Sequence, residues 1–260
     1  MKAPAFAYAK PASLAEALAL AARPGAKVLA GGQSLIPSLN MRLSAPELLV
    51  DITGIPELAG VSLKNGALRV GALTTHAEIE ASPDIRTHVP LLAQAAPYIA
   101  HPAIRNRGTL GGSLALADPA AEYPACAVAL DSVFVLRGST GERRVKALDF
   151  FKGLFETDLK AGEILVAAEF PAAKKGDRSV FLELARRQGD YATVGLAGFN
   201  DRVVFFAVGS APVLFSLDEA RKHLKERLKP VPDLYNSSAT KLHLAGVLLE
   251  RAWNTLSTSH

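Results

Sequence analysis

The stretch Val28-Leu29-Ala30-Gly31-Gly32-Gln33-Ser34 places a glycine pair directly after a short apolar run. Apolar residues follow the pair at the spacing of one helical face, namely Leu35, Ile36, Leu39 and Leu43. This order predicts a buried strand, a glycine turn and a helix capped by the Ser34 side chain. Because glycine accepts positive φ and lets the backbone approach a ligand, such a turn can direct N–H groups at an anion.

A second glycine pair lies in Thr109-Leu110-Gly111-Gly112-Ser113, again flanked by hydroxyl side chains. For each pair two interpretations stay open, a plain turn and a phosphate cradle in which hydroxyl groups add donors to the backbone N–H groups. Two cradles would suit the two phosphates of a pyrophosphate. Neither G-x-G-x-x-G opening a helix nor G-x-x-x-x-G-K-[ST] occurs, so no Rossmann or Walker nucleotide site is indicated.

Two acidic residues follow the second glycine loop. Asp118 precedes Pro119 and an apolar stretch, which predicts a helix with Asp118 as its N-cap and Pro119 at its first position. Glu122 lies one turn further along. It is either an ordinary solvated acid of a first helical turn or an acceptor for the hydroxyl groups of a ribose or ribityl chain.

The composition is that of a globular protein that belongs inside the cell. Of 260 residues, 49% are hydrophobic and 21% charged, which supports a substantial core in one large domain or two to three small ones. The 29 Lys and Arg exceed the 25 Asp and Glu by four and are interspersed, so nucleic acid is not favoured. Without a leader-like or spanning apolar run, we expect a soluble cytoplasmic protein.

Several kinds of chemistry have little support in the sequence. The single cysteine, Cys126, excludes an internal disulfide and any iron–sulfur cluster or thiolate zinc site held by this chain alone. Its Ala-rich surroundings favour an inert packed thiol. The six histidines form no tight pair, so we expect no metal site, and no G-x-S-x-G elbow is present. The polar run from Arg186 to Tyr191 is either a salt-bridged turn or a cluster of cations beside an aromatic ring.

The patterns divide the chain into three predicted domains, with boundaries at residues 1–56, 57–173 and 174–260. Asn65-Gly66 predicts a hairpin turn inside the second, and a stretch rich in Pro, Ala, Lys and Gly near residue 174 marks the last boundary. The third domain is predicted to be a small α+β module. Its three strands would be residues 180–184, 194–197 and 203–208, and its helices 218–228 and 238–256.

Taken in order, these motifs resemble the FAD-binding medium subunit of the molybdenum hydroxylases, the family of carbon monoxide dehydrogenase and xanthine dehydrogenase. The resemblance covers nearly the whole chain in one collinear order. It rests on Ala30-Gly31-Gly32-Gln33-Ser34-Leu35-Ile36-Pro37, Asn106-Arg107-Gly108-Thr109-Leu110-Gly111-Gly112-Ser113, Ala117-Asp118-Pro119-Ala120-Ala121-Glu122, Gly162-Glu163-Ile164-Leu165, Ala185-Arg186-Arg187-Gln188-Gly189-Asp190-Tyr191-Ala192 and His243-Leu244-Ala245-Gly246-Val247-Leu248-Leu249.

The resemblance implies an α+β fold in which a two-subdomain FAD-binding domain of the p-cresol methylhydroxylase type precedes a small domain with a three-stranded antiparallel sheet and helices. FAD would be bound without a covalent bond. The two loops would hold the pyrophosphate, and two acids would contact the sugar and ribityl hydroxyls. An Ile-Leu pair would contact the ring system or the adenine, and a tyrosine would lie beside the isoalloxazine. The implied cofactor-binding residues are Ala30, Gly31, Gly32, Gln33, Ser34, Leu35, Thr109, Leu110, Gly111, Gly112, Ser113, Asp118, Glu122, Ile164, Leu165 and Tyr191.

The resemblance also implies a division of labour in an oxidoreductase. A large molybdenum-cofactor subunit oxidises the substrate, a small subunit with 2Fe-2S clusters relays electrons, and the medium subunit passes them to an external acceptor in a dimer of heterotrimers. A chain with one cysteine fits this role, since it must receive electrons from clusters held elsewhere. Glu183 stands where family members often have lysine, which would alter the charge near the flavin.

Two alternatives are left open. A stand-alone flavin-dependent oxidase or dehydrogenase would need its own substrate pocket and a catalytic base, for which the sequence offers only scattered histidines. A relative that has lost its cofactor is disfavoured because both glycine pairs are intact.

Overall fold

The computed structural model describes residues 2–257 and begins with a small three-stranded parallel sheet. In this sheet β1 (Ala7–Ala9), β3 (Leu48–Asp51) and β2 (Ala26–Leu29) lie in the order β1-β3-β2. Two helices connect its strands, α1 (Leu14–Ala21) and α2 (Leu35–Asn40). The N-cap of α1 is Ser13, whose hydroxyl accepts the Glu16 N–H.

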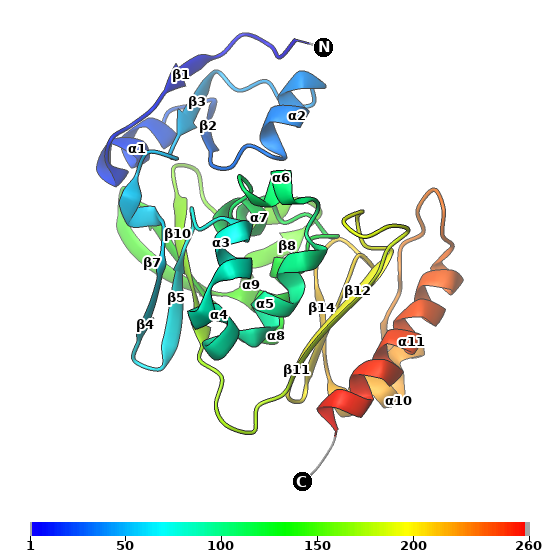
Figure 1. The fold of residues 1–260 in the computed structure, drawn as a ribbon. Coiled ribbons are helices and arrows are strands. Elements are labelled where there is room, and N and C mark those ends of the chain that lie inside the picture. Colours follow the sequence, from blue (N-terminus) through cyan, green and yellow to red (C-terminus); the bar gives the residue numbers. More distant parts are fainter. Residues whose placement is uncertain (1, 258–260) are drawn as a thin grey trace.

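A five-stranded antiparallel sheet forms the middle of the molecule (Figure 1). Its order is β4 (Val61–Lys64), β5 (Ala67–Gly71), β10 (Ile164–Pro171), β6 (Val133–Gly138) and β7 (Gly141–Lys146). The predicted hairpin between β4 and β5 is confirmed. Asn65 and Gly66 have φ values of 52° and 74°, the left-handed backbone that a tight two-residue hairpin turn requires.

Short helices pack mainly on one face of this sheet and build the largest core cluster with it, while the other face packs against α1 and the N-terminal sheet. The short helices are η1 (Pro56–Leu58), α3 (His76–Ala81), α4 (Pro83–His88), α5 (Pro90–Ala95), η2 (Ala96–Tyr98), α6 (Pro102–Arg105), α7 (Leu110–Leu116), α8 (Glu122–Ala129) and α9 (Ala147–Phe150). A small hairpin of β8 (Phe151–Gly153) and β9 (Glu156–Thr157) completes the segment. Every residue of α8 is buried, so this helix lies at the centre of the fold.

The C-terminal part is a four-stranded antiparallel sheet of β11 (Ser179–Leu184), β12 (Val194–Phe199), β13 (Arg202–Phe206) and β14 (Val213–Ser216), followed by α10 (Leu217–Arg227) and α11 (Ser238–Leu256). The predicted count of three strands is therefore wrong by one. The fourth strand has only four residues and runs directly into the capping box of α10. A run this short beside a helix start carries too little alternation to be recognised.

Both faces of this last sheet are buried. Leu196, Val203 and Phe205 pack with α10 and α11, whereas Ala197 and Val204 on the other face join the large core around α8. Figure 1 shows α8 and α11 on opposite sides of the sheet. Each predicted domain range contains one of the three larger sheets. The boundaries stay predictions, because one hydrophobic core includes residues on both sides of residue 174.

Candidate functional site

One cavity of about 590 Å³ brings the sequence motifs together. Its wall combines the loops after β2, before α7, before β10 and after β11, which lie far apart in the sequence. Leu110 does not line it, because its side chain is fully buried in the core. The predicted site residues that do line the cavity are Ala30, Gly31, Gly32, Gln33, Ser34, Leu35, Thr109, Gly111, Gly112, Ser113, Asp118, Glu122, Ile164, Leu165 and Tyr191.

The first glycine loop packs directly against the segment that leads into the second. A Cβ atom on Gly31 would lie 2.1 Å from the carbonyl oxygen of Arg107 and 2.9 Å from the Cα of Gly108. At Gly111 a Cβ would lie 2.5 Å from the Cβ of Ala72. Both positions therefore admit only glycine unless the neighbouring backbone moves, and this close packing places the two loops side by side at the cavity wall.

The first loop offers unused hydrogen-bond donors. Gly32 has a φ of 73°, which a residue with a side chain rarely adopts. Among residues 2–257, the backbone N–H groups from Gly31 to Ser34 donate to no protein acceptor, although these residues line the cavity. Buried backbone donors are almost always paired, so a run of unpaired N–H groups facing a cavity is a site for an anion.

The Ser34 hydroxyl does not cap α2, contrary to the expectation from the sequence. Ser34 is the N-cap, but its φ and ψ of −107° and −43° lie outside the extended region usual for a capping side chain, and it makes no cap hydrogen bond. The N–H of Ile36 already donates to the carbonyl of Gly32. Pro37 at the third helical position has no N–H to offer. The hydroxyl therefore stays available to the cavity.

The second loop differs from the expected cradle, because its N–H groups already have partners. Gly111 donates to the carbonyl of Ala72 at 2.8 Å, and Gly112 donates to the Thr109 hydroxyl at 3.1 Å. Ser113 donates to the Thr109 carbonyl at 3.0 Å. This loop presents to the cavity the bare backbone of its two glycines, together with the hydroxyl groups of Thr109 and Ser113.

The acidic residues after this loop differ from their predicted positions. Helix α8 begins at Glu122 with Ala121 as its N-cap, so Asp118 does not cap it. Instead the Asp118 carboxylate accepts the N–H of Ala120 at 2.9 Å, within a turn that follows the left-handed residue Ala117. The helix starts three residues later than predicted because side-chain bonding within the turn competes with helix initiation.

Glu122 is not a solvated first-turn acid. Only 8% of it is exposed, and burial raises the pKa of its carboxyl group to about 7. Burial also raises the pKa of Asp118. Both carboxyl groups face the same cavity, where a sugar or polyol hydroxyl could donate to them.

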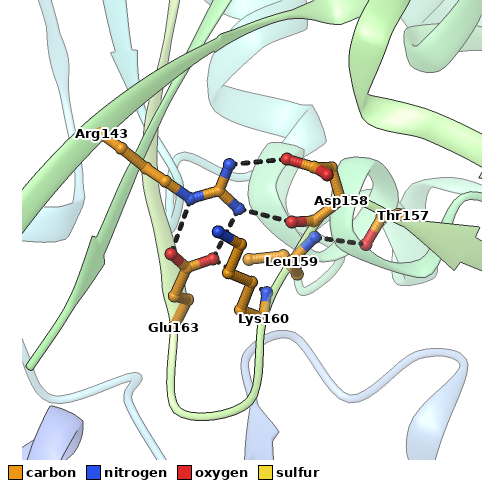
Figure 2. Close-up of polar contacts among 6 residues, drawn as sticks. All are labelled: Arg143, Thr157, Asp158, Leu159, Lys160 and Glu163. Atoms are coloured by element: carbon orange, nitrogen blue, oxygen red, sulfur yellow. Dashed lines mark hydrogen bonds and ion pairs between the residues drawn. The ribbon is translucent and has the colours of Figure 1, made fainter.

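An arginine that the sequence analysis missed holds the loop before β10. Figure 2 shows the Arg143 guanidinium of β7 between two carboxylates, with Nε 2.6 Å from Glu163 Oε1 and Nη1 2.6 Å from Asp158 Oδ2. Its Nη2 also donates to the backbone carbonyl of Asp158. This clamp holds the loop that leads into β10, whose first two residues, Ile164 and Leu165, line the cavity. Asp158 and Glu163 lie 15 and 20 positions after Arg143, so no local sequence pattern could have predicted these ion pairs.

Two further cavity residues were not predicted. His76 is 6% exposed, and burial, together with the charge of Arg105, lowers its pKa to about 4, so its ring is neutral. Its Nδ1 has no hydrogen-bond partner in the described residues. Lys27 supplies a cationic side chain from β2 to the same wall as the first glycine loop. Nothing in the local sequence pattern marks either residue as part of this site.

Other kinds of site find no support in the part of the chain that the structure describes. Within residues 2–257, no cluster of three or more His, Cys, Asp or Glu side chains is arranged to hold a metal ion. None of the helices in this part of the chain is both long and apolar enough to cross a membrane. The cavity lining includes unpaired backbone N–H groups, carboxyl groups and apolar residues.

Comparison with known proteins gives a consistent result. Residues 4–173 match the family described as the FAD binding domain in molybdopterin dehydrogenase. The carbon monoxide dehydrogenase medium chain of Hydrogenophaga pseudoflava is 42% identical over 277 residues, covering 96% of each chain. Subunit alpha of the 6-hydroxypseudooxynicotine dehydrogenase complex of Paenarthrobacter nicotinovorans is 40% identical over 278 residues, covering 96% of this chain and 94% of the relative.

Solved structures agree over the whole length. A carbon monoxide dehydrogenase from Hydrogenophaga pseudoflava that lacks the Mo-pyranopterin moiety matches with a TM-score of 0.94 at 34% identity, covering 99% of both chains. Quinoline 2-oxidoreductase from Pseudomonas putida 86 matches with a TM-score of 0.90 at 38% identity, covering 96% of both. These matches confirm the predicted α+β fold class.

Proposed function

The chain belongs to the FAD-binding medium subunits of the molybdenum hydroxylases, and from this membership we propose that its cavity binds one FAD without a covalent bond. The observation that carries the assignment to this cavity is the row of unpaired N–H groups from Gly31 to Ser34. A pyrophosphate is the part of FAD that needs such donors, and Lys27 adds a positive charge at the same wall.

The other cavity residues fit the remaining parts of FAD. The hydroxyl groups of Thr109 and Ser113 would donate to the pyrophosphate, while Gly111 and Gly112 let it approach the backbone. The carboxyl groups of Asp118 and Glu122 would accept from the sugar and ribityl hydroxyls. The proposed apolar and aromatic contacts with the ring system or the adenine are Ile164, Leu165 and Tyr191.

The chain acts as the electron-transferring subunit of an oxidoreductase. Bound FAD would supply the one- and two-electron redox chemistry of a flavin, and the cavity residues would hold and orient it. Because the chain has one cysteine, Cys126, which is buried, the iron–sulfur clusters that deliver those electrons are held by a partner subunit. The partners are a large subunit with the molybdenum cofactor and a small iron–sulfur subunit, assembled as a dimer of heterotrimers in the cytoplasm. An external acceptor takes the electrons.

The subunit role is favoured over a stand-alone flavin oxidase or dehydrogenase. The relatives that span nearly the whole chain are named as subunits or chains of larger dehydrogenases, including subunit beta of caffeine dehydrogenase from Pseudomonas at 35% identity, covering 97% of this chain. They differ in the substrate that their names give. This fits a chain whose partner, and not its own cavity, selects the substrate.

A titration of the full chain tests this function. FAD, FMN and NAD are added separately, and binding is followed by the visible flavin spectrum, by quenching of flavin fluorescence and by calorimetry for NAD. The proposal predicts saturable binding of one FAD per chain and clearly weaker binding of FMN, which lacks the second phosphate and the adenosine. Equal affinity for FMN and FAD would contradict the pyrophosphate site, and a folded chain that binds neither would contradict the function.

A further inference from the structure

The hairpin of β8 and β9 has an apolar dipeptide at its turn. Gly153 of one strand pairs with Glu156 of the other, so Leu154 and Phe155 form the two-residue turn between them. Turns of this kind are usually built from Asn, Asp and Gly, because their backbone needs positive φ. The chemistry of the turn therefore gives no reason for two large apolar side chains at these positions.

The second residue of this turn has a strained backbone. Phe155 has a φ of 54°, in the left-handed region that glycine adopts freely and a bulky side chain rarely does. Strained residues persist where the surrounding structure imposes them, and they gather at ligand sites. The chain thus keeps an aromatic ring at a position where glycine would relieve the strain.

The two turn residues differ in their relation to the cavity. Phe155 lines the cavity and is nevertheless 56% exposed, so part of its ring is open to contact. Leu154 is exposed to a similar extent, 64%, but does not line the cavity. Because covering an exposed phenyl ring removes apolar surface from water, a ligand in the cavity that covers Phe155 gains affinity from it.

The hairpin is held in place by the same clamp that holds the start of β10. Asp158 follows β9 directly, and its carboxylate accepts from the Arg143 guanidinium at 2.6 Å (Figure 2). The same guanidinium binds Glu163, the residue immediately before β10, at 2.6 Å. The turn and the first residues of β10 are therefore anchored through one side chain.

The part of the cavity lining that comes from this segment is apolar. Helix α7, which begins in the second glycine loop, contacts both β9 and β10, so the segment borders that loop. The Glu163 carboxylate is occupied by Arg143. The other lining residues between 155 and 165 are Phe155, Leu159, Ile164 and Leu165. Such a lining suits a planar ring better than a phosphate or a sugar.

We propose that Phe155 contacts a planar ring of bound FAD, together with Ile164 and Leu165, and shields that ring from solvent. The inference rests on the proposed function, which assigns Ile164 and Leu165 to the ring system or the adenine. Both are flat aromatic systems, and stacking with a phenyl ring stabilises either. The contact explains why a strained backbone is kept at this position.

The test measures FAD affinity and stability of the full chain for three variants of the turn. Phe155→Gly removes the ring and fits the positive φ, so its stability in urea unfolding should stay close to that of the wild type. Its Kd for FAD should nevertheless rise by roughly 5- to 150-fold, the effect of losing one aromatic stacking contact. Phe155→Tyr keeps a ring and should bind FAD like the wild type. Leu154→Ala is the matched control and should leave the Kd unchanged.

Titrations of the same proteins with FMN and ADP show which ring Phe155 contacts. A loss of affinity in Phe155→Gly that FAD shares with FMN identifies the isoalloxazine, and a loss that FAD shares with ADP identifies the adenine. Unchanged FAD affinity in Phe155→Gly would overturn the contact and leave the proposed function intact. An equal loss in Leu154→Ala would also overturn it, because the effect would then come from the turn and not from the ring. A folded wild type that binds no FAD would instead overturn the proposed function.

Discussion

Gly31→Ala tests whether the close packing of the two glycine loops creates the cofactor site. The new Cβ would lie 2.1 Å from the Arg107 carbonyl oxygen and 2.8 Å from its carbonyl carbon. An ordinary carbon–oxygen contact is about 3.3 Å, so the loops must separate by about 1.2 Å. The neighbouring atoms belong to backbone and cannot rotate away as the end of a flexible side chain would.

The expected losses follow from this displacement. Overpacking of this kind costs about 1–3 kcal/mol of the free energy of unfolding. Displacement of the first loop misplaces its N–H donors, and each charge-assisted hydrogen bond lost costs about 1.5–3 kcal/mol, which raises the Kd for FAD by roughly 10- to 150-fold. Both the FAD affinity and the free energy of unfolding should therefore fall.

The assay compares FAD affinity, from fluorescence quenching, with stability, from urea unfolding, for the wild type and two alanine variants. Gly209→Ala is the matched control, because a Cβ there meets nothing within 4 Å and its φ is not positive. The control should keep both properties. A Gly31→Ala protein with wild-type FAD affinity would refute the reasoning that the contact between the loops sets the geometry of the site.

Three further substitutions have defined outcomes. Arg143→Met removes the clamp and should lower the free energy of unfolding at neutral pH by about 1–3 kcal/mol in urea titrations, while weakening FAD binding. Arg143 lowers the pKa values of Glu163 and Asp158, so this contribution is full above the unfolded carboxyl pKa of about 4 and is lost as pH falls through the lowered folded pKa values. The difference in stability between the two proteins should therefore narrow steadily below about pH 4. The buried Lys241 ammonium donates to the Ala207 carbonyl at 3.0 Å and pairs with Asp233 at 2.9 Å. Lys241→Met removes both contacts and should speed up hydrogen exchange in residues 231–236, the segment that contains Asp233. Gly66→Ala, at a φ of 74° far from the cavity, should cost about 1–2 kcal/mol of stability and leave the FAD affinity unchanged.

The motifs that were predictable from the sequence are those with a local physical cause. The hairpin at Asn65-Gly66 needs left-handed backbone at two adjacent residues, which this dipeptide favours. The glycine pairs can be recognised in the sequence directly, and each forms part of the cavity lining. The family resemblance then placed the scattered motifs at one site, and all but Leu110 of the predicted residues line the cavity.

What could not be predicted depends on contacts across the fold. The Arg143 clamp joins β7 to a loop that follows later in the chain, and the N–H groups of Gly111 and Gly112 are occupied by partners that only the folded chain supplies. The burial of Glu122 arises because α8 is covered by β12 and β13 of the C-terminal sheet and by the helices α5, α7 and α9. A carboxyl group near a helix start has the same sequence signature whether water or protein surrounds it.

The central claim is that FAD binds with its pyrophosphate on the backbone N–H groups from Gly31 to Ser34. Amide NMR of the isotope-labelled chain during titration with FAD tests it most directly, with riboflavin as the ligand that lacks phosphate. We expect the largest phosphate-dependent shifts at Gly31, Gly32, Gln33 and Ser34, and smaller ones at Gly111 and Gly112, whose N–H groups are already bonded. FAD binding that leaves the amides of the first loop unshifted would contradict the account.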